Sequence, residues 1–262
     1  MDTTTLHTTP VRTTPDLSPR RAAWFAGLAY AALFVLAIFA NFAVRERLVD
    51  IEDPVGTMAD IADNEQLVRI AMLAFLIIFV LDIAVSWLLH LVLRHTGERR
   101  SVLAAWFRIA YTVFLGVAIV FMFVGLRLVD DAGFAASIDP DARAAQTLLA
   151  FDAFNATWMI GLLLFGLHLI VLARILWTSA IAPRWMAGAV GLAGVVYLVD
   201  TLGYTLLTDY ERYANVFTAI VLLPAVVGEA SLTFWLLRRG RTERAVHAPT
   251  IGAPLLGTAT SR

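Results

Sequence analysis

The sequence of 262 residues contains neither lysine nor cysteine, and each absence excludes a class of chemistry. Without lysine there is no Schiff base to retinal or pyridoxal phosphate, and no lysine to hold the phosphates in a P-loop. Without cysteine there are no disulfides, no thiolate metal site and no cysteine nucleophile. All 20 positively charged side chains are therefore arginines.

Charge of either sign is also scarce. Charged residues make up 16% of the chain, against roughly 25% in an ordinary soluble domain. Hydrophobic residues make up 60%, and the mean hydropathy is +0.76. This composition is typical of an integral membrane protein, for which the lipid bilayer is the first partner. We expect no nucleic-acid partner, no cofactor and no metal ion, and the oligomeric state is not encoded in any recognisable pattern.

Long apolar runs recur along the chain and define the predicted fold. Each is at or above the roughly 20 residues needed to cross a bilayer core. They predict an all-α, polytopic bundle of six transmembrane helices within a membrane domain at 20–240. The predicted spans are 22–44, 67–93, 102–127, 147–177, 185–207 and 214–237.

The two ends of the chain differ from this domain in composition. Residues 1–19 hold seven threonines, three prolines and no apolar run, so they predict a disordered tail and not a signal peptide. The polar residues 241–262 predict a second disordered tail.

The near-neutral total charge hides a strong asymmetry between the two sides of the predicted bundle. If both termini are cytoplasmic, that side holds 13 arginines and four acidic residues, whereas the other side holds six arginines and 14 acidic residues. Because arginines near helix ends stay on the cytoplasmic side, the pattern predicts cytoplasmic termini.

Five ionisable residues lie deep inside the predicted spans, away from the span ends, where an unpaired charge costs about 2.5 to 3.5 kcal/mol. At a rise of ~1.5 Å per residue, their depths from the cytoplasmic helix ends range from roughly 8 to 22 Å. In order of depth they are Arg108, Glu229 and His168, Asp82, and Asp200. We predict that they form a buried polar cluster, which is the candidate functional site.

Helical spacing places further polar residues beside this cluster. Asp82, Ser86 and His90 repeat every four residues and so form one stripe, which we expect to open toward the cytoplasm. Arg69 and Asp152 fall at nearly equal depth at the outer rim, where they predict an ion pair. Intramembrane glycines at 188, 191 and 194 predict a close-packing helix face and not a phosphate loop.

Two interpretations of the charged residues stay open. An ion pair of Arg108 with Glu229 or Asp82 could lock the helix packing, or it could form part of a transport or catalytic site. His168 is more typical of a hydrogen-bonded packing histidine than of a ligand or a proton relay. Haem bound by His90 and His168 is disfavoured because the two lie roughly 9 Å apart in depth.

Several segments resemble a bacterial membrane family known as domain of unknown function 4386. The central one is FGLHLIVLARILWTSAIAPRWMAGAVGLAGVVYLVD at 165–200, and GEASLTFWLLRRG at 228–240 is similar to the closing motif of the family. LVRI with Arg69, LD with Asp82 and AAWFR with Arg108 are similar to its N-terminal half. The resemblance covers about residues 20 to 240. It implies this architecture and a multi-pass protein of the bacterial inner membrane, but no reaction.

Three functions are compatible with these features. The first is a small-molecule or proton-coupled transporter, and the second is a structural or regulatory membrane protein whose buried charges only fix the helix packing. The third, an intramembrane enzyme acting on lipids, is the least favoured because no nucleophile with its base and no paired metal-binding carboxylates are recognisable. We therefore assign no catalytic residue. A water-accessible route to Glu229 and Asp82 would favour the transporter, and a dry ion pair the structural protein.

Overall fold

A computed structural model describes residues 17–130 and 133–241, and these residues form helices without any strand. The predicted tails, apart from their innermost residues, lie outside the described residues. Four of the long helices are α1 (Pro19–Ala40), α5 (Pro140–Ser179), α6 (Arg184–Leu206) and α7 (Tyr210–Arg241). The fifth, α4 (Glu65–Val129), is 65 residues long.

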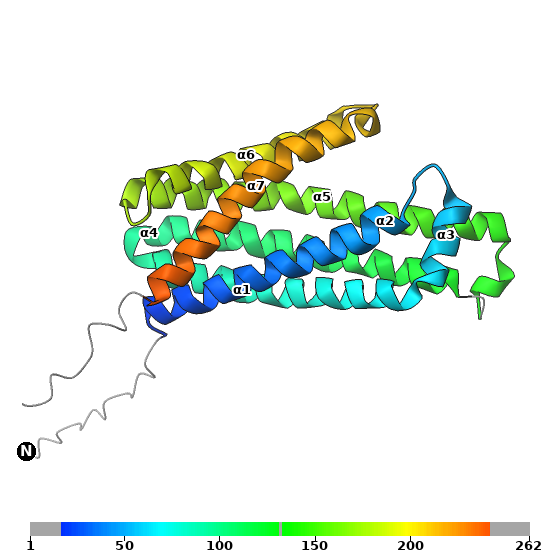
Figure 1. Ribbon diagram of the computed structural model, residues 1–262, viewed down its shortest axis with the longest axis horizontal. Coiled ribbons are helices and arrows are strands. Elements are labelled where there is room, and N and C mark those ends of the chain that lie inside the picture. The colour runs from blue at the N-terminus through cyan, green and yellow to red at the C-terminus, as the bar shows by residue number, and fades with distance from the viewer. Residues whose placement is uncertain (1–16, 131–132, 242–262) are drawn as a thin grey trace, which may run out of the picture.

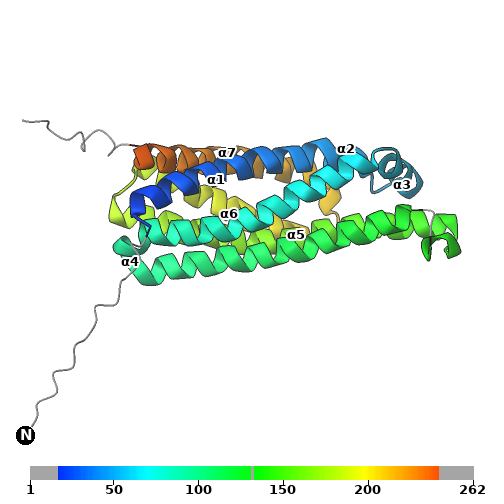
Figure 2. The same cartoon turned by 90° about the horizontal axis from the view of Figure 1, so that it is seen from below.

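The long helix α4 is a hairpin, because Gly97 has the non-helical dihedral angles φ 164° and ψ 81°. The Ser86 hydroxyl donates to the Ala105 carbonyl across the two arms at 2.9 Å. His90 Nδ1 lies 2.9 Å from Ser101 Oγ. Figure 2 shows the arms running back along each other. Five helices are long and apolar enough to cross a membrane, and the hairpin makes six crossings, which confirms the predicted all-α bundle.

The predicted connections are more helical than expected. Between the first two spans the chain forms a π-helix, η1 (Asn41–Arg45), then α2 (Glu46–Leu48) and α3 (Pro54–Asp63). A short 3₁₀ helix, η2 (Ala135–Ser137), precedes α5. The segment 94–101, which connects the second and third predicted spans, is helical on both sides of Gly97. The helices in these connections contain charged residues. They were not predicted, because the prediction relied on long apolar runs.

Several helices begin with the same local device, a capping residue followed by proline. Asp53 accepts from Gly56 N at 2.8 Å ahead of Pro54. Asp139 accepts from Asp141 N at 3.1 Å ahead of Pro140. The cap satisfies backbone N–H groups at the helix start, and proline fixes a helical φ at a position where no N–H is required.

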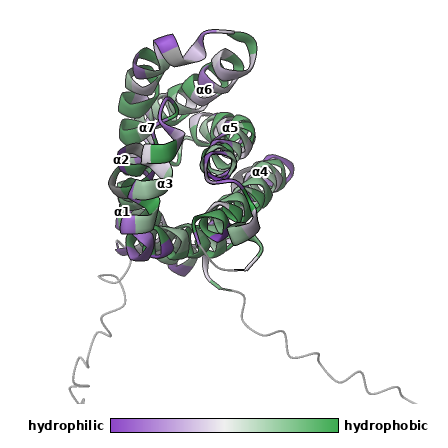
Figure 3. Cartoon of the chain, turned by 90° about the vertical axis from the view of Figure 1, so that its right-hand side faces the viewer, coloured by the Kyte–Doolittle hydropathy of each residue, from purple (hydrophilic) through white to green (hydrophobic). Residues whose placement is uncertain are grey.

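The helices pack in a ring in the order α1, α4, α5, α6, α7 and back to α1. Figure 3 shows the ring from one end. In Figure 1, the Gly97 bend, the α5–α6 turn, the start of α1 and the end of α7 all lie at one end of the molecule. We call this the arginine-rich end, and the opposite end, with α3 and the α6–α7 turn, the acidic end.

Glycine packing brings α5 and α6 into backbone contact. A Cβ added to Gly194 would lie 2.6 Å from the Gly166 carbonyl oxygen, and one added to Gly166 would lie 2.7 Å from the Gly194 carbonyl oxygen. A Cβ on Gly191 would lie 3.2 Å from Ala173 Cβ, whereas one on Gly188 would find Trp177 only at 3.8 Å. Two of the three glycines of the predicted packing face thus sit in tight contact.

Candidate functional site

The centre of the ring contains a buried ion pair between the two arms of α4. Arg108 is 1% exposed and Asp82 is 2% exposed. The Arg108 Nε donates to Asp82 Oδ1 at 3.0 Å, and Nη2 donates to the same oxygen. Since the two residues lie 26 positions apart on either side of the Gly97 bend, the hairpin itself brings them together.

The third guanidinium nitrogen connects this pair to α1 and α5. Arg108 Nη1 donates to the Tyr30 hydroxyl and lies 3.4 Å from His168 Nε2. His168 Nδ1 lies 2.8 Å from the Ala104 carbonyl oxygen, so Nδ1 carries the proton and Nε2 is the acceptor. The guanidinium also lies 5.3 Å from the Phe165 ring centroid. We call Asp82, Arg108, Tyr30 and His168 the buried network.

Tyr30 did not emerge from the sequence. Its aromatic ring counts toward the apolar length of the first span. Because it carries no charge, it does not belong to the ionisable residues whose burial in a bilayer is costly. One signal was available: Tyr30 lies 11 residues after Pro19, which at ~1.5 Å per residue is the predicted depth of Asp82.

Glu229 stands beside the buried network without joining it. Its Oε1 accepts a hydrogen bond from the Tyr197 hydroxyl at 3.0 Å, which links α7 to α6. It interacts electrostatically with Arg108 and Asp82, but among the described residues no hydrogen bond or ion pair joins it to either. Unlike the members of the buried network, Glu229 is partly exposed.

Asp200 belongs to a different place in the fold. Its Oδ1 accepts from the Tyr210 hydroxyl at 2.7 Å, across the turn between α6 and α7. Tyr210 in turn stacks on Phe217, with 5.1 Å between ring centroids. Of the five residues predicted to cluster, the structure therefore joins three directly, places Glu229 next to them and puts Asp200 at the acidic end.

The polar stripe on the second span faces the other arm of the hairpin. Asp82 accepts from Arg108, Ser86 donates to the Ala105 carbonyl, and His90 Nδ1 lies 2.9 Å from Ser101 Oγ. The expected opening toward the cytoplasm is wrong for Asp82 and Ser86, which are 2% and 1% exposed. The stripe fastens the hairpin because every third or fourth residue of one arm meets the partner arm.

Arg69 takes a partner other than the one predicted. Its Nε donates to Glu65 Oε1 at 2.7 Å, one helical turn away. Within 17–130 and 133–241 no ion pair joins Arg69 to Asp152, whose side chain is exposed on α5. Equal depth did not produce contact, because a carboxylate on the same helix lies closer.

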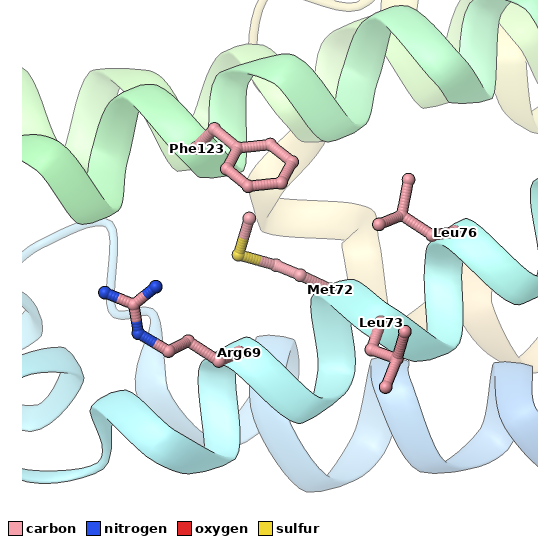
Figure 4. Close-up of a pocket in the computed structure, with 5 residues that line it drawn as sticks. All are labelled: Arg69, Met72, Leu73, Leu76 and Phe123. Carbon is pink, nitrogen blue, oxygen red and sulfur yellow. The ribbon is translucent and has the colours of Figure 1, made fainter.

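A shallow hollow of about 150 Å³ lies next to Arg69 between the arms of α4. Met72 and Phe123 approach each other across it, with Leu73 and Leu76 along its side (Figure 4). Apart from Arg69 its lining residues are apolar, and no member of the buried network lines it. It is therefore a feature of the outer surface of the hairpin and not an entrance to the polar centre.

A second polar contact, absent from the predicted site, holds the end of α1. Arg45 Nη1 donates to Asn155 Oδ1 on α5 at 2.7 Å, and Nε donates to Asn41 Oδ1 at 3.2 Å. The guanidinium lies 5.5 Å from the Trp158 ring centroid. Both Asn41 and Arg45 belong to the π-helix η1, whose wider turn could not be predicted from residue types.

The described residues contain no group of three or more histidine, aspartate and glutamate side chains placed to hold a metal ion. The site is a buried ionic network with one partly exposed glutamate, Glu229, beside it. Such an arrangement can hold helices together at the network and can exchange a proton or a cation at Glu229.

Comparison with known proteins gives a family but no activity. The family model described as Domain of unknown function (DUF4386) matches residues 25–240. An uncharacterized protein from Archaeoglobus fulgidus is 23% identical over 171 residues, which cover 65% of this chain and 84% of the relative. No solved structure matches the chain.

Proposed function

The chain belongs to the family described as domain of unknown function 4386, and from its own geometry we propose that this integral membrane protein is a small-molecule or proton-coupled transporter. Glu229 is the exchangeable group. The observation that supports this most directly is that Glu229 is a partly exposed acidic residue within a membrane-spanning helix.

Glu229 differs from the buried network in its exposure and in how many of its hydrogen-bonding positions are filled. Asp82, Arg108 and His168 are each at most 2% exposed, and each has its partners within the protein. An ionised carboxylate offers about four acceptor positions, whereas Tyr197 supplies one donor to Glu229. Because a charged group in a bilayer needs a counterpart or water, Glu229 is suited to bind a proton or a cationic group.

The charges of the polar centre also favour a positive ligand. Arg108 and Asp82 neutralise each other, and His168 accepts a hydrogen bond at Nε2 as a neutral ring does. An ionised Glu229 leaves a net charge of one negative unit. One proton or one monovalent cation would restore neutrality, which is the stoichiometry that coupled transport at a single carboxylate requires.

The second candidate is a structural or regulatory membrane protein. It is favoured by the closure of the buried network, which joins α1, both arms of α4 and α5 through Arg108. Under this alternative Glu229 and Tyr197 are simply a further contact between helices. The two candidates differ in what neutralising Glu229 does.

Glu229→Gln tests the proposal. We expect the variant to melt within about 2 °C of the wild-type protein, since this difference corresponds to at most ~1 kcal/mol and the amide still accepts from Tyr197. A panel of metabolites and lipids is screened by thermal unfolding of the purified wild-type protein. A ligand at ~100 times its dissociation constant stabilises by about 2.7 kcal/mol, and this shift should disappear in Glu229→Gln.

The matched control is Glu98→Gln, because Glu98 is an exposed glutamate next to the Gly97 bend. It should keep the shift and the ligand-driven change of internal pH in proteoliposomes, and Glu229→Gln should lose both. A Glu229→Gln protein that keeps them would contradict the proposal. A variant that instead melts as low as an Arg108→Ala protein would establish the structural alternative.

A further inference from the structure

Helices α1 and α7 touch closely at the arginine-rich end. A Cβ added to Gly27 would lie 2.8 Å from Leu237 side-chain atoms, and one added to Gly240 would lie 2.6 Å from Trp24 Cβ. Leu232 and Leu236, on the same half of α7, are fully buried. This half of the boundary between the two helices is therefore closed.

Toward the acidic end, each of the two helices is attached to a different neighbour. The π-helix η1, which directly follows α1, is tied to α5 through Arg45 and Asn155 at 2.7 Å. The start of α7 is tied to α6 through Tyr210 and Asp200 at 2.7 Å. As a result the two helices form a V in Figure 1, with its point at the arginine-rich end.

The faces that meet at the point of the V are exposed further along both helices. Ile38 follows Gly27 by 11 residues, about three turns, and is 48% exposed. Val226 precedes Leu237 by the same number and is 36% exposed. Three further residues on the acidic-end half of α7 are exposed in other directions around the helix: Val216, Ile220 and Leu223. Where α1 and α7 diverge, both helices thus carry exposed apolar side chains.

Glu229 lies between the closed part of this boundary and the exposed part, and its carboxylate points to Tyr197 inside the ring. Pro224 lies five residues away inside α7. Because proline has no N–H, it leaves the Ile220 carbonyl without its helical donor. The exposed half of α7 therefore offers a backbone acceptor on the way to the carboxylate.

We propose that the opening between α1 and α7 admits an amphipathic amine from the bilayer, whose ammonium group binds Glu229 while its apolar chain lies between the helices. This inference rests on the proposed function of Glu229 and names its ligand class. The single negative charge of the polar centre matches one ammonium group. Apolar borders on the opening and a closed arginine-rich end favour entry from lipid over entry from water.

Carbodiimides of two kinds test this access directly, since they modify protonated carboxyl groups covalently. Protein in liposomes is treated with bilayer-soluble dicyclohexylcarbodiimide or with a water-soluble carbodiimide, and modified peptides are identified by mass spectrometry. We expect modification of Glu229 by the bilayer-soluble reagent, little by the water-soluble one, and none in Glu229→Gln. Dodecylamine at ~10 times its dissociation constant should slow the modification about tenfold, whereas butylamine at the same concentration should not.

The route is tested on the cysteine-free background by blocking the opening. Ile38→Cys carrying a pyrenyl maleimide should slow modification of Glu229, because the label occupies the V. Val80→Cys carrying the same label is the matched control, since Val80 is a 62% exposed apolar residue on α4. It should leave the rate unchanged.

Three results would overturn the inference. Equal modification by both reagents would establish an aqueous route, and no modification by either would establish a closed site. Modification that appears only after a stable dimer is dissociated would show that a second copy covers the V. Each result is independent of the ligand-shift assay with Glu229→Gln, so an error about the route is distinguishable from an error about the exchangeable group.

Discussion

At the scale of single residues, Arg108 shows how this chain holds a positive charge inside a bilayer. All three guanidinium nitrogens have partners, namely Asp82, Tyr30 and His168. Tyr30 and Phe165 add aromatic faces at 4.6 and 5.3 Å from the guanidinium carbon. Removing one member of such a network leaves the others desolvated and unpaired, which costs more than the intact network contributes.

We therefore predict that Arg108→Ala destabilises the protein by about 3 to 5 kcal/mol, because Asp82 is left as a buried, unpaired charge. The measurement is reversible unfolding in detergent, followed by tryptophan fluorescence. Arg69→Ala serves as the control, since Arg69 pairs with Glu65 at a half-exposed site and an exposed pair of this spacing contributes only about 0.2 to 0.5 kcal/mol. Equal losses in the two variants would contradict this account of the buried network.

The sequence indicated the depth of the site residues but not their directions. Residue counts from the helix ends place Arg108, Asp82 and His168 in one layer, and the structure joins them. Glu229 shares this depth but bonds to Tyr197, and Asp200 bonds to Tyr210. The direction in which a side chain points depends on the tilt of its helix and on the neighbouring helices. Residue counts along one helix do not specify either. Tyr30 was missed because it carries no charge that would make it costly in a bilayer.

At the scale of helices, contact between α5 and α6 depends on glycines whose missing side chains let the two backbones approach. Gly166 and Gly194 face each other so closely that each would place a Cβ against the carbonyl oxygen of the other. Without a hydrophobic driving force between helices in lipid, such close packing is a main source of helix association.

Gly194→Ala should accordingly destabilise the protein by about 1 to 3 kcal/mol, as overpacking of a tight interface does. Gly188→Ala is the matched control on the same helix, because its new Cβ would meet only Trp177, at 3.8 Å. We expect it to be neutral or stabilising by up to ~1 kcal/mol, from the higher helix propensity of alanine. Thermal unfolding of the two variants side by side decides the matter, and a more stable Gly194→Ala protein would refute the predicted overpacking.

The helices themselves were predictable, but their ends were not. Apolar length identified all six spans, including both arms of α4, since a bilayer imposes the same requirement on each. The same criterion missed α3 and the extension of α5 back to Pro140, because their charged residues lie outside the apolar runs. Those helices are specified by capping residues and proline, which act locally and independently of hydropathy.

At the scale of the whole molecule, the two ends differ in charge and in exposed tryptophan. Four exposed tryptophans lie on helices near the Gly97 bend and the α5–α6 turn: Trp87, Trp106, Trp177 and Trp185. Arg239 and Arg241, at the end of α7, lie over the rings of Trp235 and Trp24. Tryptophan concentrates at membrane surfaces and arginine on the cytoplasmic side, so the arginine-rich end is expected to meet the cytoplasmic surface.

Cysteine labelling tests this orientation, since the protein has no cysteine of its own. Val55→Cys lies on α3 at the acidic end, where Val55 is 57% exposed. A membrane-impermeant maleimide should label it in intact cells. Glu98→Cys, beside the Gly97 bend, should be labelled only after the cells are permeabilised. The reverse pattern would invert the topology while leaving the fold unchanged.

The α4 hairpin has a consequence for how the chain enters a membrane during synthesis. Arg108 is costly for a nascent segment to carry into lipid, and its counter-ion lies only 26 residues earlier, on the neighbouring arm. As the two arms leave the translocation channel in succession, the charge can be neutralised before α5, α6 or α7 has entered the bilayer. Tyr30, which accepts from the same guanidinium, lies on α1 and so precedes both arms of α4 in the chain. Insertion of the Arg108 charge into the bilayer therefore depends on partners from helices that are adjacent in the sequence.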